Sequence, residues 1–204
     1  MFRIVKFDIL LRYIALATVA ISIAIYSLVR EEWFPELSLF KVITISSVVS
    51  TLLVMMLFTT FFSRKVWTVI GIFDRSLFPD LNGTWEGEII LEDDSSLQVR
   101  AVIRQSLLVT QIDMHGETTK SITLETTPTI EQGQKKLYYV YRSTPKNPKW
   151  SSYNGSTLFD IRNINGEQGK TVELSGHYYT DRKTIGRVRI HQVCTDSNKD
   201  VSFY

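Results

Sequence analysis

The chain has 204 residues, with 23 basic and 21 acidic side chains and a formal net charge of +2 at pH 7. Proteins that coat a nucleic-acid duplex are usually strongly basic, so we expect no polymeric nucleic acid partner, and a nucleotide ligand would need a pocket. The single cysteine, Cys194, excludes an intrachain disulfide and a cysteine-based zinc site. The three histidines lack the spacing of metal ligands, so we expect no metal and no cofactor.

Two long apolar runs open the sequence, at residues 13–29 and 42–62, and neither contains a charged residue. As a helix, the second run would be about 31 Å long, which is enough to cross the ~30 Å hydrocarbon core of a bilayer. A cleaved signal peptide is the alternative for the first run, but this run is longer than the apolar region of most signal peptides. We therefore predict a two-span transmembrane anchor over residues 1–62.

The charges that flank the two runs predict their orientation. The connecting loop contains the acidic residues Glu31, Glu32 and Glu36. Basic residues lie before the first run and after the second, at Arg3, Lys6, Arg12, Arg64, Lys65 and Arg75. Because basic flanks stay on the cytoplasmic side of a membrane, we expect both termini in the cytoplasm. Residues 63–78 then follow with a helical apolar period, which predicts an interfacial linker helix.

From residue 79 onward, apolar and polar residues alternate, as in strands with one buried face. Turn-forming segments separate these runs. The pattern predicts eight strands, at about residues 84–91, 97–105, 107–114, 119–127, 135–142, 155–163, 170–179 and 184–193. Strands joined by tight turns favour a small up-and-down antiparallel β-barrel over residues 79–204, because closure removes exposed edges. A two-sheet sandwich is the alternative.

A glycine two residues before a tryptophan opens the first predicted strand, at Gly83 and Trp85. This spacing resembles the signature of lipocalin-like barrels, in which the tryptophan closes one end and a basic residue of the last strand packs over it. Arg187 or Arg189 is the candidate for that basic residue. We therefore assign Gly83, Trp85 and Arg187 to a structural plug, with stacking of Trp85 on a ligand as the alternative.

The last predicted hairpin concentrates groups that suit a nucleotide: Tyr178, Thr180, Arg182, Lys183 and Thr184. An arginine can bind phosphate oxygens through two parallel hydrogen bonds, and an aromatic ring can stack on a base. We therefore expect ligand contacts from these five residues. A hairpin that is simply solvated would carry the same charges, and that alternative stays open.

Three further aromatic residues complete the predicted ligand-binding set. Trp150 and Tyr153 lie in the longest predicted loop, residues 143–154, and long loops are often functional. Tyr141 lies on the strand before that loop. A plain surface loop and a tyrosine buried for its packing alone are the alternatives.

Motifs of known enzymes do not occur in the sequence. It has no Walker loop, no Gly-x-Ser-x-Gly segment and no His-rich metal motif. Glu86 and Glu88 share one face of a predicted strand, but no partner marks them as catalytic. We expect a binding protein rather than an enzyme.

Two segments resemble a known family. They are residues 78–87, Phe-Pro-Asp-Leu-Asn-Gly-Thr-Trp-Glu-Gly, and residues 174–186, which begin Leu-Ser-Gly-His-Tyr-Tyr-Thr and end at Gly186. Together with two N-terminal apolar runs and a short loop, they resemble the two-transmembrane, β-strand-rich effectors of CBASS antiphage systems. Those effectors are encoded beside bacterial cGAS-like nucleotidyltransferases.

The resemblance implies a mechanism. A nucleotidyltransferase makes a cyclic di- or oligonucleotide during infection, and residues 79–204 bind it as a cytoplasmic receptor domain. The protein then forms homo-oligomers in the bacterial inner membrane, and its spans disrupt that bilayer so that the cell dies before phage matures. Two alternatives remain. A membrane-anchored lipocalin-like carrier of a lipid predicts a wide apolar barrel, and a membrane scaffold for a protein partner predicts a filled one.

Overall fold

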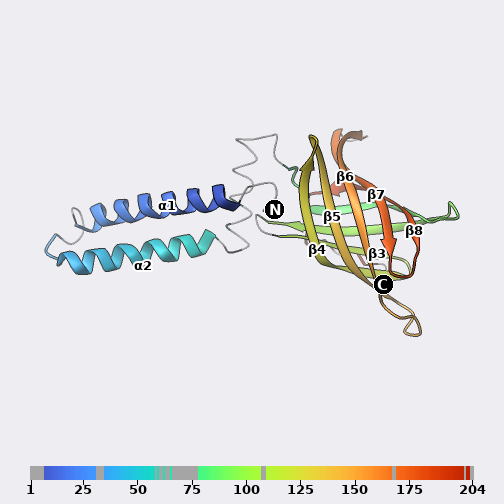
Figure 1. Cartoon of the computed structure of the whole chain (residues 1–204), viewed down its shortest axis with the longest axis horizontal. Coiled ribbons are helices and arrows are strands. Elements are labelled where there is room, and N and C mark those ends of the chain that lie inside the picture. Colours follow the sequence, from blue (N-terminus) through green and yellow to red (C-terminus); the bar gives the residue numbers. More distant parts are fainter. Residues whose placement is uncertain are drawn as a thin grey trace.

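The computed structural model of the chain describes residues 7–30, 35–57, 59, 62, 65, 78–106, 109–166, 169–199 and 201–202. In this part of the chain, two helices precede eight strands. Figure 1 shows the helices lying side by side and the strands wound into a barrel.

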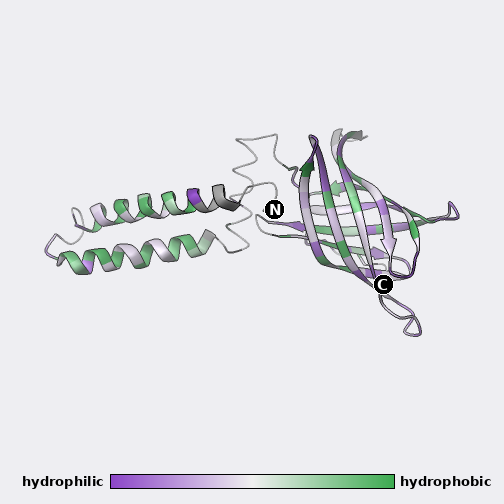
Figure 2. Ribbon diagram, viewed as in Figure 1, coloured by the Kyte–Doolittle hydropathy of each residue, from purple (hydrophilic) through white to green (hydrophobic). Residues whose placement is uncertain are grey.

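The helices α1 (Phe7–Leu28) and α2 (Leu39–Leu57) contact each other along their length. Both carry mostly hydrophobic residues (Figure 2). Hydroxyl groups in α2 donate to carbonyl oxygens of their own helix, as Thr44 does to Phe40 O at 2.9 Å, which satisfies them without water. Ser22 Oγ of α1 donates to the buried Ser50 Oγ of α2 at 2.8 Å.

Only one described helix is long and apolar enough to cross a membrane by length and composition: α2, over Leu39–Met56. The apolar stretch of α1, Arg12–Leu28, is shorter. It therefore remains a prediction that α1 also spans the membrane and that both termini lie in the cytoplasm. The linker helix predicted at residues 63–78 falls almost entirely outside the described residues.

The eight strands form a closed antiparallel barrel in which each strand pairs with its neighbours in sequence and β8 pairs with β1. Their bounds are β1 (Gly83–Ile90), β2 (Ser96–Gln105), β3 (Thr110–Gly116), β4 (Thr119–Glu131), β5 (Gln134–Pro145), β6 (Tyr153–Gly166), β7 (Gly169–Thr180) and β8 (Ile185–Cys194). The predicted eight-stranded barrel is confirmed, and the sandwich alternative is wrong.

The β4–β5 hairpin extends further than its sequence predicts. Gln132 and Gly133 form its two-residue turn with φ values of 49° and 79°, and positive φ at both positions matches the twist of a tight hairpin. Pro128 lies within β4, where the strand pairs with β5 and not with β3. A strand position that is unpaired on one side tolerates the missing N–H of proline.

Trp85 closes the barrel at the end where the chain enters β1. Its side chain is fully buried, and its Nε1 donates to Leu81 O at 3.0 Å. Gly83 has a φ of 132°, and a Cβ there would lie 1.9 Å from Cys194 O of β8. Only glycine allows this approach of the two strands.

The structure does not bring Arg187 to Trp85. The β1–β8 register pairs Arg187 with Ile90 and pairs Trp85 with Gln192, beside a bulge in which β8 has one extra residue, Val193. Arg187 is exposed, and Gln192 Nε2 donates to Asn82 O at 2.7 Å. The residue opposite the tryptophan is therefore an amide rather than a cation.

Candidate ligand-binding site

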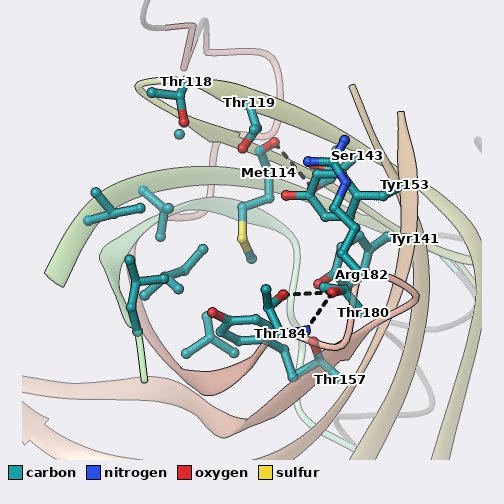
Figure 3. Close-up of a pocket in the computed structure, with 18 of the residues that line it drawn as sticks. Met114, Thr118, Thr119, Tyr141, Ser143, Tyr153, Thr157, Thr180, Arg182 and Thr184 are labelled. Carbon is teal, nitrogen blue, oxygen red and sulfur yellow. Dashed lines mark hydrogen bonds between the residues drawn. The ribbon is translucent and has the colours of Figure 1, made fainter. Parts of the chain in front are cut away.

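A cavity of about 240 Å³ lies inside the barrel, at the end opposite Trp85. All eight strands contribute to its walls, together with turns at the mouth (Figure 3). The barrel is therefore plugged at one end and hollow at the other, a point on which the sequence is silent.

The lining divides into two walls. Strands β8, β1, β2 and β3 are consecutive around the barrel. Together with Leu91, the residue that follows β1, they form the aliphatic wall: Ile89, Leu91, Leu97, Val99, Met114, Gly116 and Val188. Strands β4 to β7 and their adjoining turns form the polar wall, in which every residue carries a hydroxyl or a guanidinium: Thr118, Thr119, Ser121, Tyr139, Tyr141, Ser143, Tyr153, Thr157, Tyr178, Thr180, Arg182 and Thr184. A molecule in the cavity would meet apolar groups on one side and hydrogen-bonding groups on the other.

Glycines on neighbouring strands make room for two tyrosine rings of the polar wall. Tyr141 pairs with Gly155, and Tyr178 pairs with Gly186. A Cβ at Gly155 would lie 2.4 Å from Tyr141 Cζ, and one at Gly186 would lie 2.5 Å from Tyr178 Cε1. Tyr141 also stacks on Tyr139, with ring centres 5.0 Å apart. These contacts fix the rings that face the cavity.

The hydroxyls of Tyr141 and Tyr178 in this wall are neutral at pH 7. Burial raises the pKa of Tyr141 well above its ordinary value, and the nearby hydroxyls of Tyr153 and Tyr178 raise it further. Burial also raises the pKa of Tyr178. A neutral hydroxyl can donate as well as accept a hydrogen bond, so both groups can serve donors and acceptors of a ligand.

Arg182 is the one charged residue among the described residues that line the cavity. Its guanidinium carbon lies 4.3 Å from the centre of the Tyr153 ring (Figure 3). Its Nη2 donates to Ser151 O. Asp181 N also donates to Asn154 O at 3.0 Å. These contacts join the β7–β8 turn to the β5–β6 loop, so the cation is held in place at the mouth.

The β7–β8 turn is closed by its own hydroxyls. Thr180 Oγ1 and Thr184 Oγ1 share a hydrogen bond of 2.6 Å, and Thr184 N donates to Thr180 Oγ1 at 3.3 Å (Figure 3). Lys183 occupies the turn with a φ of 63° and is exposed. The turn thus aims two hydroxyls and Arg182 at the cavity, and not Lys183.

The structure brings together six of the predicted ligand-binding residues as cavity lining: Tyr141, Tyr153, Tyr178, Thr180, Arg182 and Thr184. Trp150 and Lys183 do not line the cavity, and Trp150 is 54% exposed. Tyr139 and Ser143 were missed, although they lie two residues on either side of Tyr141. The two-residue period of a strand places such residues on the same face, so that signal was present in the sequence.

The donor set of the site suits an organic anion. No described group of three His, Cys, Asp or Glu residues could hold a metal ion. The polar wall instead offers hydroxyls, aromatic faces and one guanidinium, which match sugar, base and phosphate groups.

A plugged barrel with a two-walled internal pocket and a fixed cation at its mouth defines a small ligand-receptor domain. Three turns at the end of the barrel remote from Trp85 contribute lining residues: Leu91 after β1, Thr118 between β3 and β4, and Arg182 and Thr184 between β7 and β8. The chain belongs to the family described as Cap15, cyclic dinucleotide receptor domain, whose model matches residues 76–192, more than half of its length. This match confirms the resemblance to CBASS effectors. No curated protein matches the chain.

Proposed function

We propose that this protein is a CBASS effector whose barrel binds a cyclic dinucleotide in the cavity at its mouth. The observation that carries the proposal is Arg182, a cation held against Tyr153 and Ser151 at the rim of a pocket with a polar wall. Its guanidinium binds one phosphate of the ligand. The rings of Tyr141 and Tyr178 face the sugar and base, and their neutral hydroxyls donate or accept hydrogen bonds there.

The effect of binding is exerted through the membrane and not by catalysis. In this proposal α1 and α2 are two spans of the bacterial inner membrane, with both termini in the cytoplasm. The ligand binds an assembled state more tightly than the monomer and shifts the equilibrium by that difference in affinity. The assembled spans then disrupt the bilayer, and the infected cell dies.

The two alternatives fit the cavity less well. A carrier of an apolar ligand would use the aliphatic wall, but it would leave Arg182 and the buried hydroxyl of Ser143 facing hydrocarbon. Burying a polar group without a partner is costly. A scaffold for a protein partner needs no cavity, whereas this barrel contains one of about 240 Å³.

Thermal melting of the full chain in detergent micelles tests the receptor function. A cyclic dinucleotide at a hundredfold excess over its Kd should stabilise the folded protein by about 2.7 kcal/mol. Arg182→Ala should remove most of that stabilisation. Arg162→Ala is the matched control, because Arg162 of β6 has a side chain that is 64% exposed outside the barrel and outside the cavity lining.

Two outcomes of this experiment would contradict the proposal. The first is an unchanged melting temperature with every cyclic di- and trinucleotide tried. The second is an equal ligand-induced shift in the wild type and in Arg182→Ala. Either result would favour the alternative function, in which the barrel carries an apolar ligand.

Fusions of alkaline phosphatase test the orientation, since the enzyme is active only outside the cytoplasm. We expect an inactive fusion at the C-terminus and an active one in the segment at residues 35–38. An active C-terminal fusion would place the receptor domain outside the cytoplasm, away from any nucleotide made there.

A further inference from the structure

Polar and apolar lining residues lie on separate walls of the cavity. The strands that follow each other as β8, β1, β2 and β3 contribute no hydrogen-bonding side chain to the described lining. Every residue of the polar wall, on strands β4 to β7 and their turns, contributes at least one. The two halves of the barrel therefore present different surfaces to whatever lies between them.

A cyclic dinucleotide consists of two nucleotides joined in a ring through two phosphates. When its bases are identical, its two halves are chemically equivalent. A site that treats both halves alike would have to present each recognition group twice. This cavity presents its hydroxyls, its tyrosine rings and its guanidinium on one side only.

The position of the single cation also separates the two halves. Arg182 is the one charged residue of the described lining, so it can neutralise one phosphate inside the site. A second phosphate placed against the buried residues Val99 and Met114 would lose its water without gaining a partner, which is strongly unfavourable. The second phosphate therefore remains in water at the mouth, and the ligand is held by one half.

Selection among bases follows from the same contrast. Ser143 and Tyr178 are both buried, so a base that leaves their hydroxyls unpaired carries a penalty. The aliphatic wall distinguishes ligands by volume and not by hydrogen-bonding pattern. A site that hydrogen-bonds its ligand rejects a mismatched group far more strongly than an apolar site does.

We propose that the pocket reads the two nucleotides of its ligand unequally: the polar wall selects one base, and the aliphatic wall accepts the other with little regard to its hydrogen-bonding groups. This inference rests on the proposed receptor function. It predicts that one base is required and that the second position is permissive within a size class.

Dissociation constants of mixed ligands test the inference on the full chain in detergent micelles. Each panel holds three 3′,3′-cyclic dinucleotides with bases of one size, uracil with cytosine or adenine with guanine. In the panel that binds, the mixed ligand should bind about twofold to threefold more weakly than the better symmetric ligand, because only one of its two orientations is selected. The poorer symmetric ligand should bind at least ~10-fold more weakly, as for a mismatched base in a hydrogen-bonding site.

Substitutions on the two walls should act differently. Tyr178→Phe and Ser143→Ala remove polar-wall hydroxyls and should narrow the gap in affinity between the two symmetric ligands. Leu97→Ala, on the aliphatic wall, should weaken all three ligands by a common factor. Tyr179→Phe is the matched control for Tyr178→Phe, because Tyr179 is 53% exposed and does not line the cavity.

Three results would overturn the inference. The logarithm of the Kd of the mixed ligand could lie midway between those of the symmetric ligands, which means that both halves are read alike. Leu97→Ala could change the difference in affinity between the two symmetric ligands as much as the polar-wall variants do. Finally, neither Tyr178→Phe nor Ser143→Ala could change that difference. If no cyclic dinucleotide binds at all, the proposed function itself fails and this inference fails with it.

Discussion

Replacing Gly155 by alanine should displace the tyrosine that faces the cavity. The new Cβ would lie 2.4 Å from Tyr141 Cζ and 2.4 Å from Tyr141 Oη, whereas ordinary contacts begin at 3.4 Å. The ring must therefore move by about 1 Å, although it is stacked on Tyr139 at 5.0 Å. Overpacking of this kind costs about 1–3 kcal/mol, which corresponds to a fall in Tm of roughly 4–12 °C for a domain of this size.

A double-mutant cycle with Tyr141→Leu measures whether the ring is the cause. Melting of the full chain in detergent should show that Gly155→Ala costs little once the ring is gone. Gly116→Ala is the matched control, because its Cβ would find its nearest atoms at 3.6 Å, and it should change Tm only slightly. If Gly155→Ala costs the same with and without the Tyr141 ring, within ~0.5 kcal/mol, the steric reasoning is refuted.

Two further predictions concern the pH dependence and the plugged end. Burial raises the pKa of Tyr141, so the folded chain holds that proton more tightly than the unfolded chain. The free energy of unfolding should stay constant below the ordinary tyrosine pKa of ~10 and fall as pH rises through it. Tyr141→Phe should make that fall shallower in denaturant titrations, and an equally steep fall would contradict the assignment. Trp85→Phe leaves Leu81 O without its indole donor and should cost about 1–3 kcal/mol without changing ligand affinity. A loss of affinity in a folded Trp85→Phe protein, measured by ligand titration, would show that the two ends of the barrel are coupled.

The alternation of side chains along the chain predicted the strands well, because the two-residue period is a local property. Several hairpin turns also carried their own signal, as the segment Glu-Gln-Gly-Gln at residues 131–134 does; Gln132 and Gly133 adopt positive φ there. Closure into a barrel followed from the number of strands and the short turns. The predicted hairpin residues Thr180, Arg182 and Thr184 meet at one cavity because they are close in sequence.

Side-chain partners across strands could not be predicted in the same way. A bulge at the step from Thr84 to Trp85 shifts the β1–β8 register by one residue, and this shift sets Gln192, rather than Val193, opposite the tryptophan. Arg187 pairs with Ile90, towards the other end of the two strands. One residue of slip reverses which face a side chain occupies. No pattern within β1 or β8 alone records such a shift.

The sequence by itself determined the apolar N-terminal runs, the strands and the cation-bearing turn, because each depends on residues that are near one another in the chain. Only the tertiary structure decided that the barrel is hollow at one end and that its cavity has a polar and an aliphatic wall. Leu97 and Val99 read as ordinary core residues until the closed strand order places them across the cavity from Tyr141 and Ser143. The physical reason is that a wall is made by strands that are distant in sequence, and its chemistry exists only once the register and the closure bring them together.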